Sequence, residues 1–142
     1  MIKQTLLIVV IALFTITSTF SQEQNANNAP QKPQKYYGEP VRFADQMPEF
    51  PGGMDSLYAI IKREMNYPKN AKNNYIQGTV LVEFSITEDG SVDRAVIKVS
   101  AHPLIDEEAL RIVRSLPKWI PAKVNGKPVA VWYTLPVSFN IQ

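Results

Sequence analysis

The pattern of apolar and polar residues predicts three strands in the C-terminal two-thirds of the chain. The clearest alternation runs over residues 129–141, and strict alternation is typical of a strand with one buried face. A second alternating run covers residues 80–86 and precedes Asp89-Gly90. Because Asp and Gly tolerate the positive φ of a tight turn, this pair predicts a hairpin into a strand over residues 92–99.

The strand over residues 92–99 carries an irregularity. Three of its residues share one parity and are expected to face the core: Ala95, Ile97 and Val99. Val92 falls on the other parity, so we expect a β-bulge near Asp93 and Arg94. In the neighbouring run, the residues expected to face inward are Val80, Val82, Phe84 and Ile86.

Two segments have apolar residues at helical spacing. The first begins after Gly53 and ends at Pro68, a short helical turn follows over residues 69–74, and the second helix begins near Asp106 and ends at Pro117. The residues expected on their buried faces are Met54, Leu57, Tyr58, Ile61 and Met65, and then Ile105, Ala109, Ile112, Val113 and Leu116. The order helix, hairpin, helix, strand predicts an α+β domain with two helices on one face of a three-stranded antiparallel sheet.

The last strand, which we expect Asn125-Gly126 to lead into, contains Pro136. A strand tolerates proline only where its missing N–H would face solvent or a bulge, so Pro136 indicates an open edge. By parity, four further residues direct their backbone groups outward, namely Trp132, Thr134, Ser138 and Asn140, while Tyr133, Leu135, Val137 and Phe139 pair inward.

An open edge can accept an extended peptide as an added strand. The candidate partner-binding residues are Val131, Trp132, Tyr133, Thr134, Leu135, Pro136, Val137, Ser138 and Asn140. The alternative is that Pro136 only protects the edge against unwanted pairing.

The N-terminal third has a different composition. Residues 1–21 combine Lys3, nine uninterrupted apolar residues over 6–14 and a polar end at Ser21, which predicts a cleaved secretory signal peptide. The alternative is an uncleaved anchor, although a membrane-spanning helix needs about 20 apolar residues. Residues 22–45 are rich in Pro, Asn and Gln and are predicted to be a linker, followed by a domain over residues 46–142.

Composition argues against several classes of chemistry. The chain has no cysteine, and without Lys3 its 14 basic and 13 acidic residues give a formal charge of +1, which does not favour nucleic-acid binding. His102 is the single histidine and is expected in a loop, without the context of a catalytic triad with Ser100 and Asp106. Acidic residues from Asp106 to Glu108 suit a helix N-terminus better than a metal site. We therefore predict a non-enzymatic protein without catalytic residues, metal ligands or cofactors.

A series of short motifs runs in order from about residue 45 to the end of the chain. They include Met47-Pro48-Glu49-Phe50-Pro51-Gly52-Gly53, Tyr67-Pro68, Gly78-Thr79-Val80, Asp89-Gly90-Ser91-Val92, Leu116-Pro117 with Trp119, and Asn125-Gly126-Lys127-Pro128-Val129 with Tyr133. In order and spacing this part of the chain resembles the C-terminal domain of the TonB family, in a short form with a signal peptide. The resemblance implies a periplasmic domain that binds an extended segment of an outer-membrane receptor and supports energy-dependent transport across the outer membrane.

The expected partners follow from the resemblance. They are a TonB-dependent outer-membrane receptor or another periplasmic protein, a second copy of the chain, and inner-membrane motor proteins. Proteins of the TonB type are held in the inner membrane by a helix that carries a histidine, and residues 1–21 contain none. A periplasmic location is therefore expected, with an inner-membrane anchor facing the periplasm as the alternative. Two further functions stay open: a motor-independent adaptor or structural protein, and a cell-wall-binding domain that uses Trp119 and nearby lysines.

Overall fold

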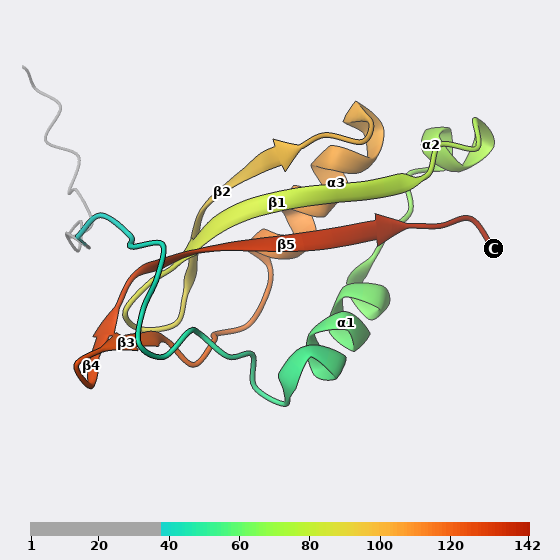
Figure 1. Cartoon of the computed structure of the whole chain (residues 1–142). Coiled ribbons are helices and arrows are strands. Elements are labelled where there is room, and N and C mark those ends of the chain that lie inside the picture. The colour runs from blue at the N-terminus through green and yellow to red at the C-terminus, as the bar shows by residue number, and fades with distance from the viewer. Residues whose placement is uncertain (1–37) are drawn as a thin grey trace, which may run out of the picture. The chain divides into compact units, whose positions relative to one another are not determined.

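The computed structural model describes residues 38–142 (Figure 1). The predicted signal peptide, residues 1–21, and the linker as far as residue 37 lie outside the described residues. In chain order the elements are α1 (Gly53–Glu64), α2 (Lys69–Asn73), β1 (Gly78–Ile86), β2 (Val92–Val99), α3 (Pro103–Arg114), β3 (Ala122–Val124), β4 (Lys127–Val129) and β5 (Val131–Phe139). Over this described range, no helix combines the length and apolar character required to cross a membrane.

β1 is the central strand of a three-stranded antiparallel sheet with the order β2-β1-β5 (Figure 1). Val80 pairs with Val137, and Phe84 pairs with Tyr133, so the alternating runs of β1 and β5 lie in register. All four residues expected to face inward from β1 are fully buried. The predicted α+β fold is confirmed, with α1 and α3 contributing to one core with this face of the sheet.

The two long helices bury unequal shares of their predicted faces. Every residue expected on the buried face of α3 and at its C-terminal end is buried. In α1 only Leu57 and Ile61 are buried, whereas Met54 is 43% and Tyr58 44% exposed, so their assignment to the core was wrong. The exposure follows from where α1 lies, which is below the C-terminal part of β5 (Figure 1). One side of α1 lines a groove beside β5 and is not covered by other elements.

The start of α3 was predicted three residues too late, and His102, expected in a loop, lies in extended backbone directly before the helix. Pro103 is the first helical residue, a position where proline's missing N–H is not needed. His102 is the N-cap, and its Nδ1 accepts a hydrogen bond from the backbone N–H of Leu104 at 3.1 Å. The Asp106 carboxylate accepts hydrogen bonds from Ser100 Oγ and from the Ala101 N–H.

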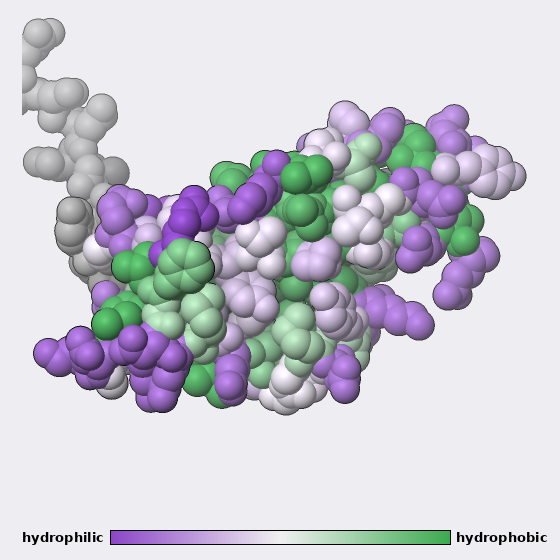
Figure 2. All heavy atoms as spheres, in the orientation of Figure 1, coloured by the Kyte–Doolittle hydropathy of each residue, from purple (hydrophilic) through white to green (hydrophobic). Residues whose placement is uncertain are grey.

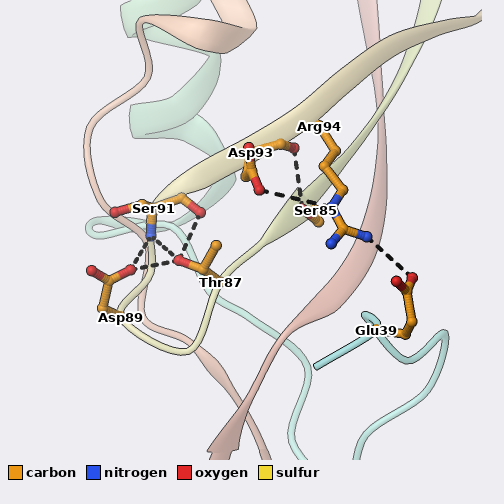
Figure 3. Close-up of polar contacts among 7 residues, drawn as sticks. All are labelled: Glu39, Ser85, Thr87, Asp89, Ser91, Asp93 and Arg94. Atoms are coloured by element: carbon orange, nitrogen blue, oxygen red, sulfur yellow. Dashed lines mark hydrogen bonds and ion pairs between the residues drawn. The ribbon is translucent and has the colours of Figure 1, made fainter. Parts of the chain in front are cut away.

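β2 contains two interruptions of its ladder with β1. The predicted bulge is confirmed at Arg94, which has φ +49° and reaches Glu39 at 3.1 Å (Figure 3). A second register shift lies between Ile97 and Val99. This shift turns Val99 outward, where it is 50% exposed, so the prediction that Val99 faces the core was wrong.

The turn between β1 and β2 is closed by a small polar network (Figure 3). The Asp89 carboxylate accepts hydrogen bonds from Thr87 Oγ1 and from the Ser91 N–H. The hydrogen bond from Thr87, together with those from Ser91 and Lys118, outweighs partial burial and holds the pKa of Asp89 well below its usual range. The predicted hairpin is confirmed.

Asn125-Gly126 forms a turn, but this turn joins β3 to β4 instead of leading directly into β5. Both residues have positive φ, +50° and +74°, as a type I′ hairpin requires. The expected strand over residues 129–141 is therefore divided, because Ala130 separates β4 from β5. Alternation alone does not reveal that division, since it continues across the break.

Candidate functional site

β5 is an edge strand whose second side is open to the surroundings over most of its length. The Trp132 N–H donates to the Val41 carbonyl at 2.9 Å, and the Val41 N–H donates to the Ala130 carbonyl at 2.9 Å. Because Trp132 uses its outer side, the backbone groups of the even-numbered residues of β5 point away from β1. The structure therefore agrees with the parity expected from Pro136.

The beginning of this edge is already occupied by the chain itself. Val41 forms a parallel bridge with Val131, and the following segment pairs with Lys123 through Gln46 and with Ile120 through Glu49. Residues from Val41 onward thus contact the rest of the described domain. The boundary of the linker at residue 45 stays a prediction. What remains accessible is the edge from Thr134 to Asn140, which we call the open edge; among the described residues its outward backbone groups have no backbone partner.

The predicted site residues divide by parity, as expected. Val131, Leu135 and Val137 are fully buried, and Tyr133 is half-buried against the core. Pro136, Ser138 and Asn140 are exposed, while Trp132 and Thr134 are half-buried. The odd-numbered residues thus hold the strand in the core, and the even-numbered ones direct their backbone groups away from β1.

A groove of about 550 Å³ lies between α1 and the C-terminal part of β5. The open edge contributes Pro136, Ser138 and Asn140, and α1 and the residue after it contribute Tyr58, Ile61, Lys62 and Met65. Viewed from the same side as Figure 1, the surface has weakly polar and apolar residues over its middle and strongly hydrophilic ones mainly at its two ends (Figure 2). We call this hollow the edge groove.

The contribution of α1 was missed by reasoning from the sequence. Helical spacing placed Met54 and Tyr58 on the face of α1 that was expected to be buried, yet both are exposed. Tyr58 lines the edge groove, while Met54 Sδ accepts a hydrogen bond from the Tyr133 hydroxyl at 3.9 Å. Burial raises the pKa of Tyr133, and the neighbouring Tyr58 raises it further. The apolar stripe on α1 was a correct signal for contact, but it could not distinguish a core from a groove.

The outer face of the sheet next to the open edge is polar. Glu83 accepts hydrogen bonds from Lys98 at 2.8 Å and from Arg42 at 3.1 Å. The hydrogen bond from Lys98, with a smaller one from Arg42, outweighs desolvation and lowers the pKa of Glu83. Thr79 and Ser138 share a hydrogen bond of 2.9 Å. The side chains on this face are thus engaged with one another, and the edge groove lies on the helix-covered side.

Trp119, proposed as a surface contact for cell wall, is a core residue. It is 3% exposed and packs against Phe50, Phe84 and Tyr133, with ring centroids 5.1, 6.0 and 5.0 Å away. The backbone N–H of Trp119 also donates a hydrogen bond to the Gly90 carbonyl at 2.8 Å. A buried indole offers no face to a ligand, so the structure argues against a cell-wall site at Trp119.

The described residues form an α+β domain that presents one open edge strand beside a helix-lined groove, the backbone arrangement that strand addition requires. Residues 63–141, more than half of the chain, match the family described as the Gram-negative bacterial TonB protein C-terminal. The chain belongs to this family.

Two solved structures are similar to the chain. Both are solution NMR structures of the Helicobacter pylori TonB C-terminal domain. The first, of residues 194–285, is 25% identical, with a TM-score of 0.48 and coverage of 61% of this chain and 91% of that one. The second, of residues 179–285, is 24% identical, with a TM-score of 0.49 and coverage of 63% and 80%. Comparison with curated proteins gives no match.

Proposed function

We propose that this protein binds extended segments of TonB-dependent outer-membrane receptors in the periplasm by adding them as a strand to β5. In this role it acts as a binding module that supports energy-dependent transport across the outer membrane, and it catalyses no reaction. The observation that carries the proposal is the open edge from Thr134 to Asn140, which lies beside the edge groove. Membership of the TonB C-terminal family supports the choice of partner.

The backbone of the open edge sets the scale of binding. Thr134, Ser138 and Asn140 offer N–H donors, and these residues and Pro136 offer carbonyl acceptors. Each backbone hydrogen bond contributes about 0.5–1.5 kcal/mol net. Since association itself costs at least about 4 kcal/mol, the backbone alone gives weak binding, and side-chain contacts in the edge groove must supply specificity.

Substitution of Ser138 tests strand addition directly. Ser138→Pro removes an outward N–H without touching the ladder to β1, so we expect about 2- to 12-fold weaker binding of a receptor-derived peptide. Ser138→Ala keeps the N–H and serves as the matched control, with affinity close to that of the unmodified chain. The measurement is an NMR titration of the 142-residue chain with synthetic peptides from the periplasmic ends of outer-membrane receptors, following the backbone amides of residues 134–140.

Two outcomes would count against the proposal. The absence of shifts along residues 134–140 at millimolar peptide would overturn binding at this edge. Equal affinities of the Pro and Ala variants would show that the peptide does not accept a hydrogen bond from the Ser138 N–H, as strand addition at this edge requires. Sedimentation at increasing concentration, run in parallel, reports whether the same edge instead pairs with a second copy of the chain.

A further inference from the structure

We propose that Asn125 is a site of spontaneous covalent modification, in which its side-chain amide is lost through a succinimide formed with Gly126. The product, aspartate or isoaspartate, carries a negative charge beside Asp45 and weakens the attachment of residues 41–49 to the rest of the domain. This inference goes beyond peptide binding and does not depend on it. It is carried by three features of the β3–β4 turn: its free reacting groups, its short strands and its contact with Asp45.

The reaction needs no reagent other than water. The backbone nitrogen of Gly126 loses its proton to solvent base and attacks Cγ of Asn125, so that a new carbon–nitrogen bond closes the succinimide ring. The side-chain nitrogen takes up a proton from water and leaves as ammonia. Water then opens the ring at one of its two carbonyls. Opening at Cγ gives aspartate, and opening at the main-chain carbonyl gives isoaspartate, in which the chain continues through the side-chain carboxyl.

Both reacting groups at this turn are accessible. Asn125 and Gly126 are exposed, and nothing lies within 4 Å of a Cβ built on Gly126. Among the described residues, neither the Asn125 side-chain amide nor the Gly126 N–H has a hydrogen-bond partner. Glycine also leaves the approach to its nitrogen unobstructed, because it has no side chain. Asn125-Gly126 is the single Asn-Gly pair in the sequence.

The Asp89-Gly90 turn can form the same ring but is protected by its contacts. The Asp89 carboxylate accepts hydrogen bonds from Thr87, Ser91 and Lys118, and the Gly90 N–H donates to the Thr87 carbonyl at 2.9 Å. The same hydrogen bonds lower the pKa of Asp89 and keep its side chain ionised, and a carboxylate is a poor target for a nucleophile. The structure therefore favours modification at Asn125 over Asp89.

The two turns also differ in how easily they open. The Gly126 nitrogen must approach Cγ of Asn125 closely, so the turn has to leave its left-handed conformation for the ring to form. β3 and β4 have three residues each, and a two-stranded ribbon is only marginally stable by itself. The Asp89 turn instead joins strands of nine and eight residues within the three-stranded sheet. Local opening thus adds to the difference in reactivity.

The consequence of the modification follows from the contact with Asp45. The Asp45 carboxylate accepts a hydrogen bond from the Asn125 N–H at 2.8 Å, and next to it the Gln46 N–H donates to the Lys123 carbonyl at 3.1 Å. A carboxylate at position 125 places a like charge beside Asp45. Isoaspartate also adds a main-chain carbon to a turn whose type depends on its two-residue length. Both products weaken the pairing of Gln46 with β3.

The first experiment follows the chemistry. The full 142-residue chain is incubated at mildly alkaline pH, folded or in urea, and its peptides are mapped by mass spectrometry with enzymatic methylation of isoaspartate. In the folded chain we expect both products at Asn125 and no isoaspartate at Asp89, whereas in urea both sites react. Asn125→Gly is the matched control, because Gly-Gly keeps the turn and the N–H to Asp45 but has no amide to lose. An unmodified Asn125 in the folded chain would overturn the proposal, and equal reaction of Asp89 would overturn the argument from contacts.

The second experiment measures the consequence. Asn125→Asp represents the aspartate product, and we expect the Gln46 N–H to exchange with solvent about 5- to 30-fold faster in it than in Asn125→Gly. The Val82 N–H in the central strand serves as the reference for global stability and should exchange equally in both. Asp45→Asn should remove most of the difference. Equal exchange of Gln46 would overturn the weakened attachment, and a difference that persists with Asp45→Asn would overturn its assignment to charge repulsion.

Discussion

At the scale of single residues, Gly90 is more constrained than its place in a turn suggests. Its φ is +84°, and a Cβ at this position would lie 1.9 Å from the backbone carbonyl oxygen of Trp119. Gly126 has a similar φ of +74°, but nothing lies within 4 Å of a Cβ built there. Replacing Gly126 by alanine therefore tests the cost of the left-handed backbone conformation alone. Replacing Gly90 by alanine adds the cost of a collision with the Trp119 backbone.

Gly90→Ala should destabilise the protein much more than Gly126→Ala. For Gly126→Ala we expect a loss of about 1–2 kcal/mol in the free energy of unfolding, the cost of a left-handed conformation for a residue with a side chain. Gly90→Ala adds the displacement of Trp119, so we expect a total loss of about 3 kcal/mol or more. Urea denaturation followed by tryptophan fluorescence measures both, and equal losses would contradict the close packing of Gly90 on Trp119.

At the scale of elements, a single polar connection joins the C-terminal end of α1 to α3. Glu108, 8% exposed, accepts a hydrogen bond of 2.7 Å from the Asn66 N–H and pairs with Arg111 at 2.7 Å. Arg111 also donates to the Glu64 carbonyl at 2.6 Å, which satisfies an acceptor at the end of α1. This connection fixes the helix that forms one wall of the edge groove.

The same connection makes stability depend on pH. Burial alone would raise the pKa of Glu108, but the hydrogen bonds from Arg111 and Asn66 outweigh it and lower the pKa. The stabilisation is therefore present above the unfolded pKa of about 4.3 and is lost as pH falls through the lower folded value. We expect Glu108→Gln to cost about 1–3 kcal/mol at pH 7, and the difference from the unmodified chain to shrink under acid.

The control for this prediction is Glu107→Gln, since Glu107 is the exposed neighbour on the same helix. Urea denaturation between pH 7 and pH 3 provides the measurement. A constant difference between the Glu108→Gln variant and the unmodified chain over this range would show that the carboxylate charge is not what stabilises the connection.

The elements that could be predicted from the sequence are those whose signal is local. The alternation of β1, the Asp89-Gly90 turn and the apolar face of α3 each depend on residues close in the chain, and all were confirmed. The exposure of Tyr58 and of Val99 could not be predicted in this way. The exposure of Tyr58 depends on where α1 docks relative to the sheet, and that of Val99 depends on a register shift between β1 and β2. Both are properties of the tertiary structure.

Part of the candidate site could be predicted from the sequence. Pro136 indicated an open edge because proline lacks a donor, and the observed strand order places β5 at the edge. Two features could not be inferred: the wall formed by α1 and the Val41 segment that covers the beginning of β5. Both bring together residues far apart in the chain, and no periodicity encodes such contacts.

At the scale of the whole molecule, Pro136 controls how many donors the open edge presents to any partner. Pro136→Thr adds one N–H on the outer side, so we expect about 2- to 12-fold tighter binding of a receptor-derived peptide and more self-association of the chain. Peptide titration and sedimentation velocity measure the two effects. Increased self-association without tighter peptide binding would indicate that Pro136 only protects the edge.

Pro128→Thr is the matched control for this substitution. Pro128 is also an exposed proline in a strand, but it belongs to the β3–β4 hairpin instead of the open edge. Sedimentation and peptide affinity should be unchanged in this variant.

The two register shifts of β2 against β1 have a consequence for assembly. Molecules whose sheets have two regular edges can pair edge to edge without limit and grow into fibrils. β2 interrupts its ladder with β1 twice and carries Asp93, Arg94 and Lys98, so its edge is irregular and charged. Within the three-stranded sheet of the described residues, β5 therefore has the more regular edge. Two molecules that join through this edge would form a closed two-fold pair, so we expect edge-to-edge association of this sheet to stop at a pair.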